Sequence, residues 1–585
     1  MGKTWGVEVP IDTLGKPEPG AHGYVPLDPK TETLNQGWNG FGRSISCDIV
    51  VDRDDCFTVR DGVKLYADIY RPRGDAKVPA IICWSPFGKN FNGIDSLRLM
   101  TPWNLGIPDG TLSGLGKFEG LDPADWVPRG YAIVNIDSRG AFHSEGVMTI
   151  MGSQEAEDGY DVIEELALRE WCTGDIGMAG NSHLAIAQWF IAALRPPHFR
   201  AMAPWEGCGD LYREQFARGG IYGGHLFDQL IQKHMLKGAH GIESFRRMYE
   251  KSPLANEWWN DKRPNMSQID IPMYITGTWS NTMHGMGAIR AWLETKSRQK
   301  WLRWHGHQEW YDLWGDEKSK IELLEFFDHF LLGKDNGWQA TPRVRMASLR
   351  FGAQSPISDI RVEGFPLPDT QYRKAYLHGP GKLSFGSPTL AAEQSLSYDS
   401  EDPNSCLSFR HTFDTATRLM GIPKAVLYMS AEDTDDMDVF VILRKISKSG
   451  EPMLSLNIPW KGLPVNTIAD IPDDKRTEVI LYAGPTGMQR ASLRAIDSTK
   501  SMHENWPFTP LDREDKPGQG CVVKLEIGIW AFGIDYEQGE SIQLQVCGSL
   551  QGVSNFHDAT GSKNKGKHAL YLGGSHDSHV VLPFV

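Results

Sequence analysis

The sequence predicts an α/β fold, with a doubly wound sheet in the first half of the chain and an all-β domain in the second. In the first half, short apolar runs bounded by turn residues, at 78–84 and 131–137, suit buried parallel strands. Residues 154–170 have helical spacing, and this alternation of strands and helices is typical of a doubly wound sheet. Beyond about residue 340, helical periodicity disappears and short alternating strands recur, which predicts a β-sandwich.

The other elements of the first half follow in chain order. Residues 1–43 are rich in Pro and Gly and predict an arm that lies on the surface. Residues 47–51 and 55–70 predict a β-hairpin that turns at Asp61-Gly62. Three further strands and a closing amphipathic helix are predicted at 199–205, 271–277, 300–305 and 321–332.

An insertion interrupts the predicted sheet. Residues 208–268 are rich in aromatic residues and partly helical, and an insertion at this point would lie over the strand ends as a helical cap. The chain is therefore divided into an N-terminal arm, a core, the cap and a β domain, at 1–43, 44–207 with 269–338, 208–268 and 339–585. The clearest strands of the β domain are predicted at 425–430, 438–443, 522–530 and 541–546.

Composition narrows the classes of function. A net charge of −14 argues against nucleic acid and anionic membrane surfaces as partners, and leaves a small-molecule substrate. The sequence has no apolar run of membrane-spanning length and no apolar signal core at its N-terminus, which predicts a cytoplasmic location. The eight cysteines lack C-x-x-C or ligand spacing, so we expect reduced thiols and neither a metal nor another cofactor.

The strongest local motif is Ile176-Gly-Met-Ala-Gly-Asn-Ser-His-Leu-Ala-Ile-Ala-Gln-Trp-Phe190. A short apolar run ends at Gly180-Asn-Ser182, and a helical pattern follows at once. A strand, a sharp turn and a helix form a nucleophile elbow, which lifts a serine hydroxyl to the rim of a sheet. The usual G-x-S-x-G pattern is broken at Leu184, but the flanking sequence still favours the elbow, with Ser182 as the nucleophile.

Several blocks of sequence occur in a characteristic order along the chain. They include Asp137-Ser-Arg-Gly-Ala-Phe-His-Ser-Glu-Gly146, Gly180-Asn-Ser-His-Leu-Ala-Ile-Ala-Gln-Trp189, Ala203-Pro-Trp-Glu-Gly207, Gly277-Thr-Trp279, Ala431-Glu-Asp-Thr-Asp-Asp-Met-Asp-Val-Phe440 and Arg490-Ala-Ser-Leu-Arg-Ala-Ile-Asp497. From about residue 50 to 585 the chain resembles the cocaine esterase and X-prolyl dipeptidyl-peptidase family of serine hydrolases. The resemblance implies an α/β-hydrolase core, a helical cap and a C-terminal jelly-roll. Large apolar surfaces in this family are also consistent with a homodimer.

A serine nucleophile needs a histidine to remove its proton. In α/β-hydrolases the histidine follows the last core strand, and Trp304-His-Gly-His-Gln-Glu-Trp310 occupies that place. We predict His305 as the base, with His307 as the alternative. The family has an aspartate where this chain has Asn281, so we expect Asn281 or a neighbouring carboxylate, Glu309 or Asp312, to orient the base.

The predicted oxyanion hole also departs from the family. The resemblance implies two donors, the backbone N–H of His183 and a tyrosine hydroxyl, but Phe87 stands at the tyrosine position. His183 is either a further acid/base group or a packed residue at the rim. We expect Trp279 and Tyr212 to contact the substrate. The other aromatic residues of the cap line an apolar pocket or form the core of the cap: Phe216, Tyr222, Phe227, Trp258 and Trp259.

These features favour a serine hydrolase that acts through an acyl-enzyme on an ester or amide with a bulky, apolar acyl group. The departures at Asn281 and Phe87 keep a second class open, a non-hydrolytic enzyme that performs acyl transfer, cyclisation or isomerisation on the same scaffold. A third reading is a binding protein without catalytic chemistry. X-prolyl peptidase activity is less favoured, because the sequence identifies no acidic site for the free amine of a peptide.

Overall fold

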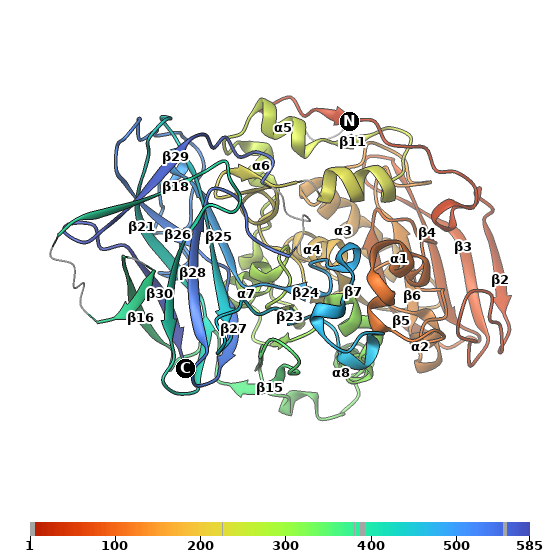
Figure 1. Cartoon of the computed structure of the whole chain (residues 1–585). Helices are drawn as coiled ribbons and strands as arrows, with labels where there is room; N and C mark the ends of the chain where they lie inside the picture. Colours follow the sequence, from red (N-terminus) through yellow and green to blue (C-terminus); the bar gives the residue numbers. More distant parts are fainter. Residues whose placement is uncertain (1–5, 225, 380, 387–391, 554–558) are drawn as a thin grey trace.

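The computed structural model describes residues 6–224, 226–379, 381–386, 392–553 and 559–585. Two parts lie side by side, a mixed α/β part that contains the N-terminal half and a β-rich part that contains the C-terminus (Figure 1). Their buried side chains form one continuous hydrophobic cluster that runs through both sheets. The predicted sequence of an α/β core followed by a β-rich half is therefore confirmed.

The α/β part is organised around one sheet, to which eleven strands of the described residues belong. In the middle of the sheet the strands from β14 to β6 in spatial order are parallel, and antiparallel strands extend both edges. In spatial order they are β15 (Ile357–Val362), β14 (Val344–Ser348), β13 (Lys300–His305), β12 (Met273–Thr278), β8 (Phe199–Trp205), β7 (Cys172–Asn181), β5 (Val78–Ser85), β6 (Ala132–Asp137), β4 (Lys64–Pro72), β3 (Ile49–Thr58) and β2 (Lys30–Leu34).

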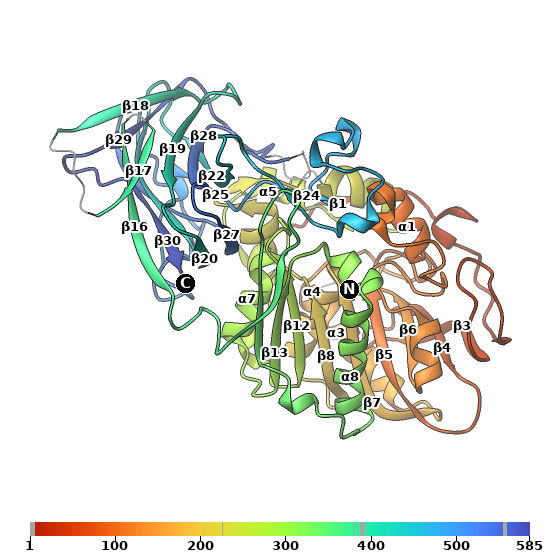
Figure 2. The same cartoon turned by 60° about the horizontal axis from the view of Figure 1, so that its bottom comes forward.

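Helices cover the sheet. Helix α3 (Ser153–Ala167) packs on α4 (His183–Ala193), which contacts β5, β7 and β8, and α8 (Glu317–Leu331) contacts β7 and β8 (Figure 2). Consecutive residues of a strand point to opposite faces, and all residues from 176 to 181 in β7 are buried. The centre of the sheet is thus covered on both faces. The remaining α-helices are α1 (Gly93–Met100), α2 (Pro123–Trp126), α5 (Phe245–Lys251), α6 (Glu257–Asp261) and α7 (Gly285–Glu294).

The predicted core strands and the hairpin are observed close to their expected positions. Strands β3 and β4 pair antiparallel around Asp61-Gly62, as the turn residues predicted. Two boundaries differ. Strand β2 lies in the predicted arm but pairs with β3, and β14 and β15 continue the sheet beyond the predicted limit at residue 338. These edge strands were not predicted because their sequences have little hydrophobic periodicity. They form because their backbones pair with neighbouring strands.

The segment at 208–268 contains short elements that lie between the core and the β-rich part. Two π-helical stretches, Leu211–Phe216 and Leu226–Met235, precede α5 and α6. Short strand pairs tie the segment to itself and to the arm: β9 (Ala217–Arg218), β10 (Ile221–Tyr222), β11 (Ile242–Glu243) and β1 (Ile11–Asp12). The predicted partly helical character of this segment agrees with these elements.

The C-terminal half forms a sheet whose described strands pair antiparallel, except for one short parallel contact between Lys382 and Arg410. The strands are β16 (Gln371–His378), β17 (Lys382–Phe385), β18 (Gln394–Asp399), β19 (Cys406–Thr412), β20 (Thr417–Gly421), β21 (Lys424–Ala431), β22 (Asp438–Ile446), β25 (Thr486–Arg490), β26 (Val523–Gly528), β27 (Phe532–Tyr536), β28 (Ser541–Cys547), β29 (Lys567–Leu572) and β30 (His579–Phe584). Between β22 and β25 the chain leaves this sheet, forms the pair β23 (Ser455–Leu456) and β24 (Leu481–Tyr482), and reaches the α/β part near α1 (Figure 2).

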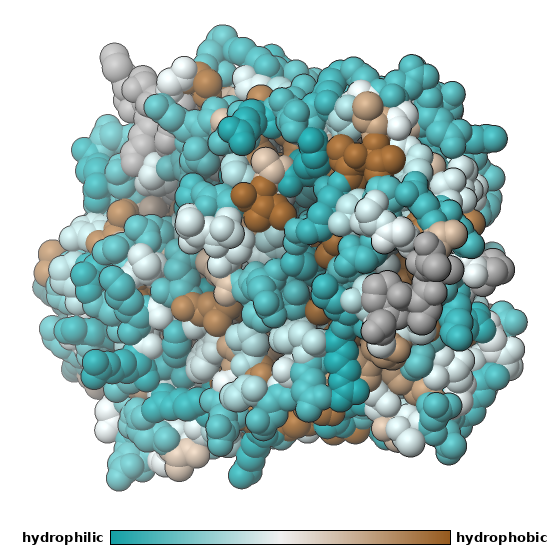
Figure 3. Space-filling model, turned by 90° about the vertical axis from the view of Figure 1, so that its left-hand side faces the viewer, coloured by the Kyte–Doolittle hydropathy of each residue, from teal (hydrophilic) through white to brown (hydrophobic). Residues whose placement is uncertain are grey.

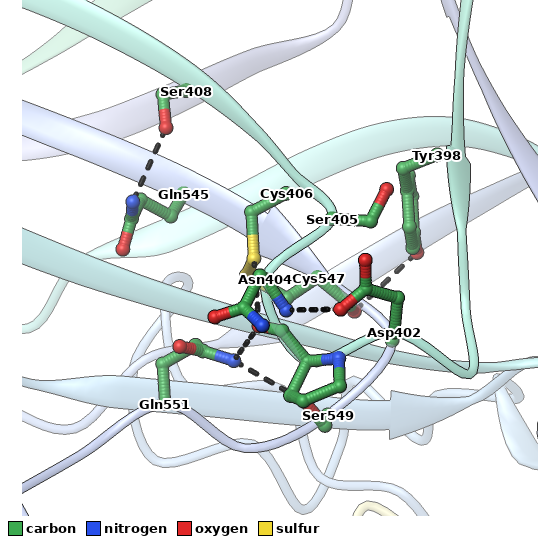
Figure 4. Close-up of a disulfide and its surroundings, with 12 residues drawn as sticks. Tyr398, Asp402, Asn404, Ser405, Cys406, Ser408, Gln545, Cys547, Ser549 and Gln551 are labelled. Atoms are coloured by element: carbon green, nitrogen blue, oxygen red, sulfur yellow. Dashed lines mark hydrogen bonds between the residues drawn. A yellow bond between two sulfur atoms is a disulfide. The ribbon is translucent and has the colours of Figure 1, made fainter.

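The expectation that all eight cysteines are reduced is wrong for two of them. Cys406 in β19 and Cys547 in β28 occupy directly paired positions and form a disulfide (Figure 4). The two cysteines are 141 residues apart in the sequence, and only the register of β19 and β28 brings them together. Their spacing in the sequence therefore did not indicate a disulfide. Disulfides persist mainly in oxidising compartments, so this bond weakens the sequence argument for a cytoplasmic location.

The surface of the β-rich part is mainly hydrophilic. The face seen in Figure 3 carries apolar residues in small groups among polar ones, as is usual for a surface in contact with water. Among the described residues, none of the helices has the length and apolar character needed to cross a bilayer.

A buried ion pair connects the β-rich part to the segment at 208–268. Arg490 bonds to both carboxylate oxygens of Asp438, at 2.8 and 2.9 Å, and also donates to the carbonyl of Gly220 and to the hydroxyl of Tyr249. We expect Asp438→Ala to lower the free energy of unfolding by about 3–5 kcal/mol, because it leaves a buried guanidinium without its counter-charge. Thermal and urea unfolding measure the effect.

The matched control is Asp435→Ala, in the loop that leads into β22. This variant removes an exposed carboxylate that pairs with Lys516. Exposed pairs contribute little to stability, so this variant should unfold like the wild type. Equal stability of the Asp438 and Asp435 variants would contradict a structural role for the buried pair.

Candidate active site

The predicted nucleophile lies in a sharp turn between β7 and α4. Ser182 has φ 55° and ψ −119°, a conformation that non-glycine residues rarely adopt. Gly180 precedes it with φ 134°, and a Cβ there would come within 2.5 Å of the Leu184 side chain and 2.7 Å of the Glu119 carbonyl. The strand, turn and helix predicted from the sequence are all present, with Ser182 at the N-terminus of α4, where developing negative charge is favoured.

Two neighbouring loops share this strained geometry. Glu119 and Glu206 also have positive φ, 63° and 58°. Their carbonyls accept the backbone N–H groups of the turn, from Asn181 to Glu119 at 3.2 Å and from Ser182 to Glu206 at 3.0 Å. Each such residue costs on the order of 1–3 kcal/mol, and clusters of this kind persist where the surrounding structure holds them, often at functional sites.

His284 forms a side-chain hydrogen bond with Ser182. Its Nε2 lies 3.1 Å from Ser182 Oγ, within reach for proton transfer. His284 caps the N-terminus of α7 in the loop after β12 and is 2 % exposed. His284 was not among the predicted site residues, because the α/β-hydrolase chain order places the histidine in the loop after β13.

The two histidines predicted from that order lie elsewhere. His305 Nε2 is 2.5 Å from Glu206 Oε1 and 3.6 Å from Asp312 Oδ2. The ring of His307 makes an edge-to-face contact with Tyr311. Burial and the charge of His305 lower the pKa of His307 to about 4. The geometry corrects the choice of base, since the observed contact with Ser182 favours His284 over His305 and His307.

Asn281 occupies the loop after β12 and connects several of these groups. Its Oδ1 accepts the backbone N–H of His284 at 3.1 Å, and its Nδ2 donates to Glu206 and Glu309 at 2.9 and 3.2 Å. Asn281 therefore positions the His284 backbone, whereas we had expected it to orient His305. Of the carboxylates considered with it, Glu309 bonds to Asn281 and Asp312 bonds to Arg303.

Buried carboxyl groups surround Ser182. Burial raises the pKa of Glu119 to about 8, against the opposing effects of Trp310, Ser182, Lys117 and the His183 amide. Burial also raises the pKa of Glu309 well above its usual range, helped by the charges of Glu206 and Glu119. At neutral pH the site therefore holds fewer negative charges than its carboxyl groups would suggest.

His183 is a structural residue by its side-chain contacts. Its Nε2 lies 2.8 Å from Glu155, a buried carboxylate that also accepts the indole N–H of Trp84 at 2.8 Å. Although burial opposes ionisation, the pKa of Glu155 lies below its usual value because of His183. The backbone N–H of His183 directly follows Ser182 in the chain, and the ring of Phe87 packs edge-on against the His183 imidazole.

Ser182 lines two adjoining pockets. One is bounded by Phe87, Phe118, Leu226, Met235 and Trp310 together with Glu119, Glu309 and Glu478, and the second by Phe87, Met151, Phe216, Phe227 and His284. Glu478, which reaches the first pocket from the insertion between β22 and β25, has a pKa raised by burial to about 7. The predicted apolar pocket is present, with acidic groups in its wall.

Two residues that were expected to contact the substrate pack instead against other side chains of the protein. The Trp279 indole donates to the Ala347 carbonyl at 2.6 Å and packs on Trp304. Tyr212 stacks on Trp259 at 4.5 Å and donates its hydroxyl to the Pro253 carbonyl. These contacts place Trp279 and Tyr212 in the core, which corrects the expectation. Phe87, by contrast, lines both pockets as expected.

One signal in the sequence is shared by Glu206 and His284, which were not predicted, and by Glu309, which was predicted only as an alternative partner of the base. Glu206, His284 and Glu309 follow the carboxyl ends of β8, β12 and β13, where ligands bind in open α/β sheets. A search for ionisable residues just after each parallel strand would have found them. Glu119 lies in the long loop between α1 and α2, and its approach to Ser182 depends on the tertiary fold.

Comparison with known proteins agrees with this architecture. Residues 61–310 match the X-Pro dipeptidyl-peptidase (S15 family), and residues 336–581 match the X-Pro dipeptidyl-peptidase C-terminal non-catalytic domain. Cocaine esterase of Rhodococcus sp. (strain MB1 Bresler) is 25% identical over 411 residues, which cover 59% of this chain and 67% of that protein.

Solved structures match over nearly the whole chain. A CocE/NonD family hydrolase from Staphylococcus aureus is 29% identical, with a TM-score of 0.83, over 98% of this chain and 100% of that one. An α-amino acid ester hydrolase, at 16% identity and a TM-score of 0.63 over 92% and 97% of the two chains, shares the fold.

The hydrogen bonds of Asn281 lead to a specific expectation for Asn281→Asp. An aspartate cannot donate to Glu206 and Glu309, and it adds a third carboxylate at hydrogen-bond distance from both. We expect a lower melting temperature and lower ester hydrolysis, although the substitution restores the residue type expected from the family. A circular-dichroism melt and an esterase assay measure both. An increase in activity would contradict this role of Asn281.

Proposed function

We propose that this chain, which belongs to the X-Pro dipeptidyl-peptidase (S15) family of hydrolases, cleaves esters or amides with a bulky apolar acyl group through an acyl-enzyme on Ser182. The observation that carries the proposal is the 3.1 Å contact between Ser182 Oγ and His284 Nε2 at a strained strand-to-helix turn. An activated serine at such a turn is the arrangement of a nucleophile elbow.

The reaction follows from this contact. The Ser182 oxygen attacks the carbonyl carbon of the substrate while its proton passes to His284 Nε2, and the carbonyl electrons move to the oxygen. The bond to the leaving alcohol or amine then breaks, and His284 gives the proton to that group. Water repeats the sequence on the acyl-enzyme and releases the acid, with His284 again accepting and returning the proton.

The apolar walls of the two pockets support the proposed acyl group. Phe118, Leu226 and Trp310 line one side of Ser182, and Phe216 and Phe227 line the other. We propose that residues 208–268 act as a cap, because Leu226, Met235 and Phe227 from this segment line the two pockets at Ser182. We also propose that the β-rich half has a jelly-roll topology.

A second candidate is hydrolysis of a substrate with a cationic amine beside the acyl group. Both Glu309, which is buried, and Glu478, which is half-buried, lie in the wall of the Ser182 pocket, and the raised pKa of each falls when a cation binds next to it. The sequence analysis had found no acidic site for an amine. These two carboxyl groups favour such substrates, as the match to X-Pro dipeptidyl-peptidases also suggests.

The nucleophile and its base are tested by labelling with a fluorophosphonate probe, read by intact mass. The wild type should gain one adduct, and Ser182→Ala should gain none. His284→Ala should label about 10²–10⁴-fold more slowly, because the serine loses its general base. His305→Ala and His307→Ala are the controls and should retain most of the wild-type rate. Loss of labelling in His305→Ala alone would return the role of base to His305.

The two substrate classes are separated with paired p-nitrophenyl esters that differ only in an α-ammonium or an α-methyl group. If the amine binds at Glu478, Glu478→Gln should raise KM for the ammonium ester about 10–100-fold, the usual range for a charge-assisted hydrogen bond. The methyl ester should be unaffected. Equal changes for both esters would indicate a packing effect and contradict amine binding at this carboxyl group.

A further inference from the structure

The carboxyl group of Glu119 lies next to the nucleophile without being part of the serine–histidine contact. Glu119 is 1 % exposed, and it interacts with both the Ser182 hydroxyl and the His183 backbone N–H. Its Oε1 accepts the indole N–H of Trp310 at 3.1 Å. Its Oε2 is fully buried and has no well-aligned hydrogen bond, which leaves a polar atom to be explained at the centre of the site.

The carboxyl group of Glu119 lies where the reaction needs a second hydrogen-bond donor for the oxyanion. When Ser182 attacks a carbonyl, the oxygen becomes negatively charged and is usually stabilised by two donors. The His183 backbone N–H, directly after the nucleophile, supplies one of them. The side chain of Phe87, which packs against His183 and lines both pockets, has no hydrogen-bond donor.

We propose that Glu119, as a neutral carboxylic acid, is the second donor of the oxyanion hole. The inference rests on the proposed serine hydrolase function. Because Oε1 accepts the Trp310 indole N–H, the proton resides on Oε2. The Oε2–H group then donates to the oxygen of the tetrahedral intermediate. Glu119 keeps this proton throughout: the proton that moves is the one exchanged between Ser182, His284 and the leaving group.

The surroundings of Glu119 favour the neutral form. Burial is the largest influence on Glu119 and raises its pKa to about 8, although hydrogen bonds from Trp310, Ser182 and the His183 amide oppose the shift. Lys117 in the same loop favours the charged form, but its ammonium group is directed to the carbonyls of Ser85 and Ile136 at 3.2 and 2.6 Å. His284 contacts the serine hydroxyl through Nε2 at 3.1 Å. A buried carboxylic acid that stays protonated can donate to an oxyanion.

The sign of the pH dependence follows from this role. The donor is present below the pKa of Glu119 and is lost as the pH rises through about 8, so kcat/KM should fall on the alkaline side. A carboxylate acting as a base would give the opposite slope. Glutamine in place of Glu119 keeps an acceptor for Trp310 and offers an amide N–H that does not titrate.

The test compares the wild type, Glu119→Gln and Glu119→Ala in ester hydrolysis between pH 6 and 10. Glu119→Gln should retain most of the activity at pH 7 and lose the alkaline decrease. Glu119→Ala should lose about 10²–10³-fold in kcat, as expected for removal of one oxyanion donor, with KM little changed. Glu214→Gln is a matched control, because Glu214 is also buried with a pKa raised to about 7 and bonds to the Gly209 amide in the 208–268 segment. Its pH profile should match the wild type.

The outcomes separate this inference from the proposed function. If the wild type reacts with a fluorophosphonate at Ser182 but Glu119→Gln is as inactive as Glu119→Ala, a charged Glu119 is required and the donor role is overturned. Persistence of the alkaline decrease in Glu119→Gln overturns it as well. A wild type that gives no adduct overturns both proposals. Melting temperatures of the three variants identify any loss that is due to misfolding.

Discussion

The active site depends on the conformation of the turn at Ser182. Ser182 has a positive φ, and backbone bonds to Glu119 and Glu206 hold the turn in place. Because Glu119 and Glu206 are themselves in left-handed conformations, three strained residues support one another. Gly180 makes the arrangement possible by leaving room for Leu184 and for the Glu119 carbonyl. The carboxyl group of Glu119 interacts with the Ser182 hydroxyl, whereas that of Glu206 contacts His305 and Asn281.

Electrostatics at the site follow from burial. Glu206 pairs with His305 and Asn281, whereas Glu119 and Glu309 lie in the pocket wall with raised pKa values. Charged carboxylates so close together would repel one another, and neutral forms relieve that repulsion. Asn281 contributes by donating to two of these groups and by holding the backbone of His284. An amide suits this position better than a carboxylate would.

Much of the fold was predictable from the sequence because buried parallel strands and amphipathic helices have distinct periodicities. The turn at Ser182 was predictable for a similar reason, since Gly180 and the adjoining apolar run encode it locally. His284 was missed because its contact with Ser182 depends on the path of the loop after β12. Glu119 approaches from a loop with no periodic signal, and the Cys406–Cys547 bond depends on the register of β19 and β28. Contacts between distant loops and strands were therefore the part that periodicity did not reveal.

The central claim is that Ser182, His284 and the His183 amide together form the reactive centre. A crystal structure of the enzyme after reaction with a phosphonate ester tests it most directly. The account predicts a covalent bond to Ser182 Oγ, with His284 Nε2 beside that oxygen and the phosphoryl oxygen facing the His183 N–H and Glu119. An adduct in which His305 has moved to Ser182 Oγ, or a phosphoryl oxygen directed away from the His183 N–H, would contradict it.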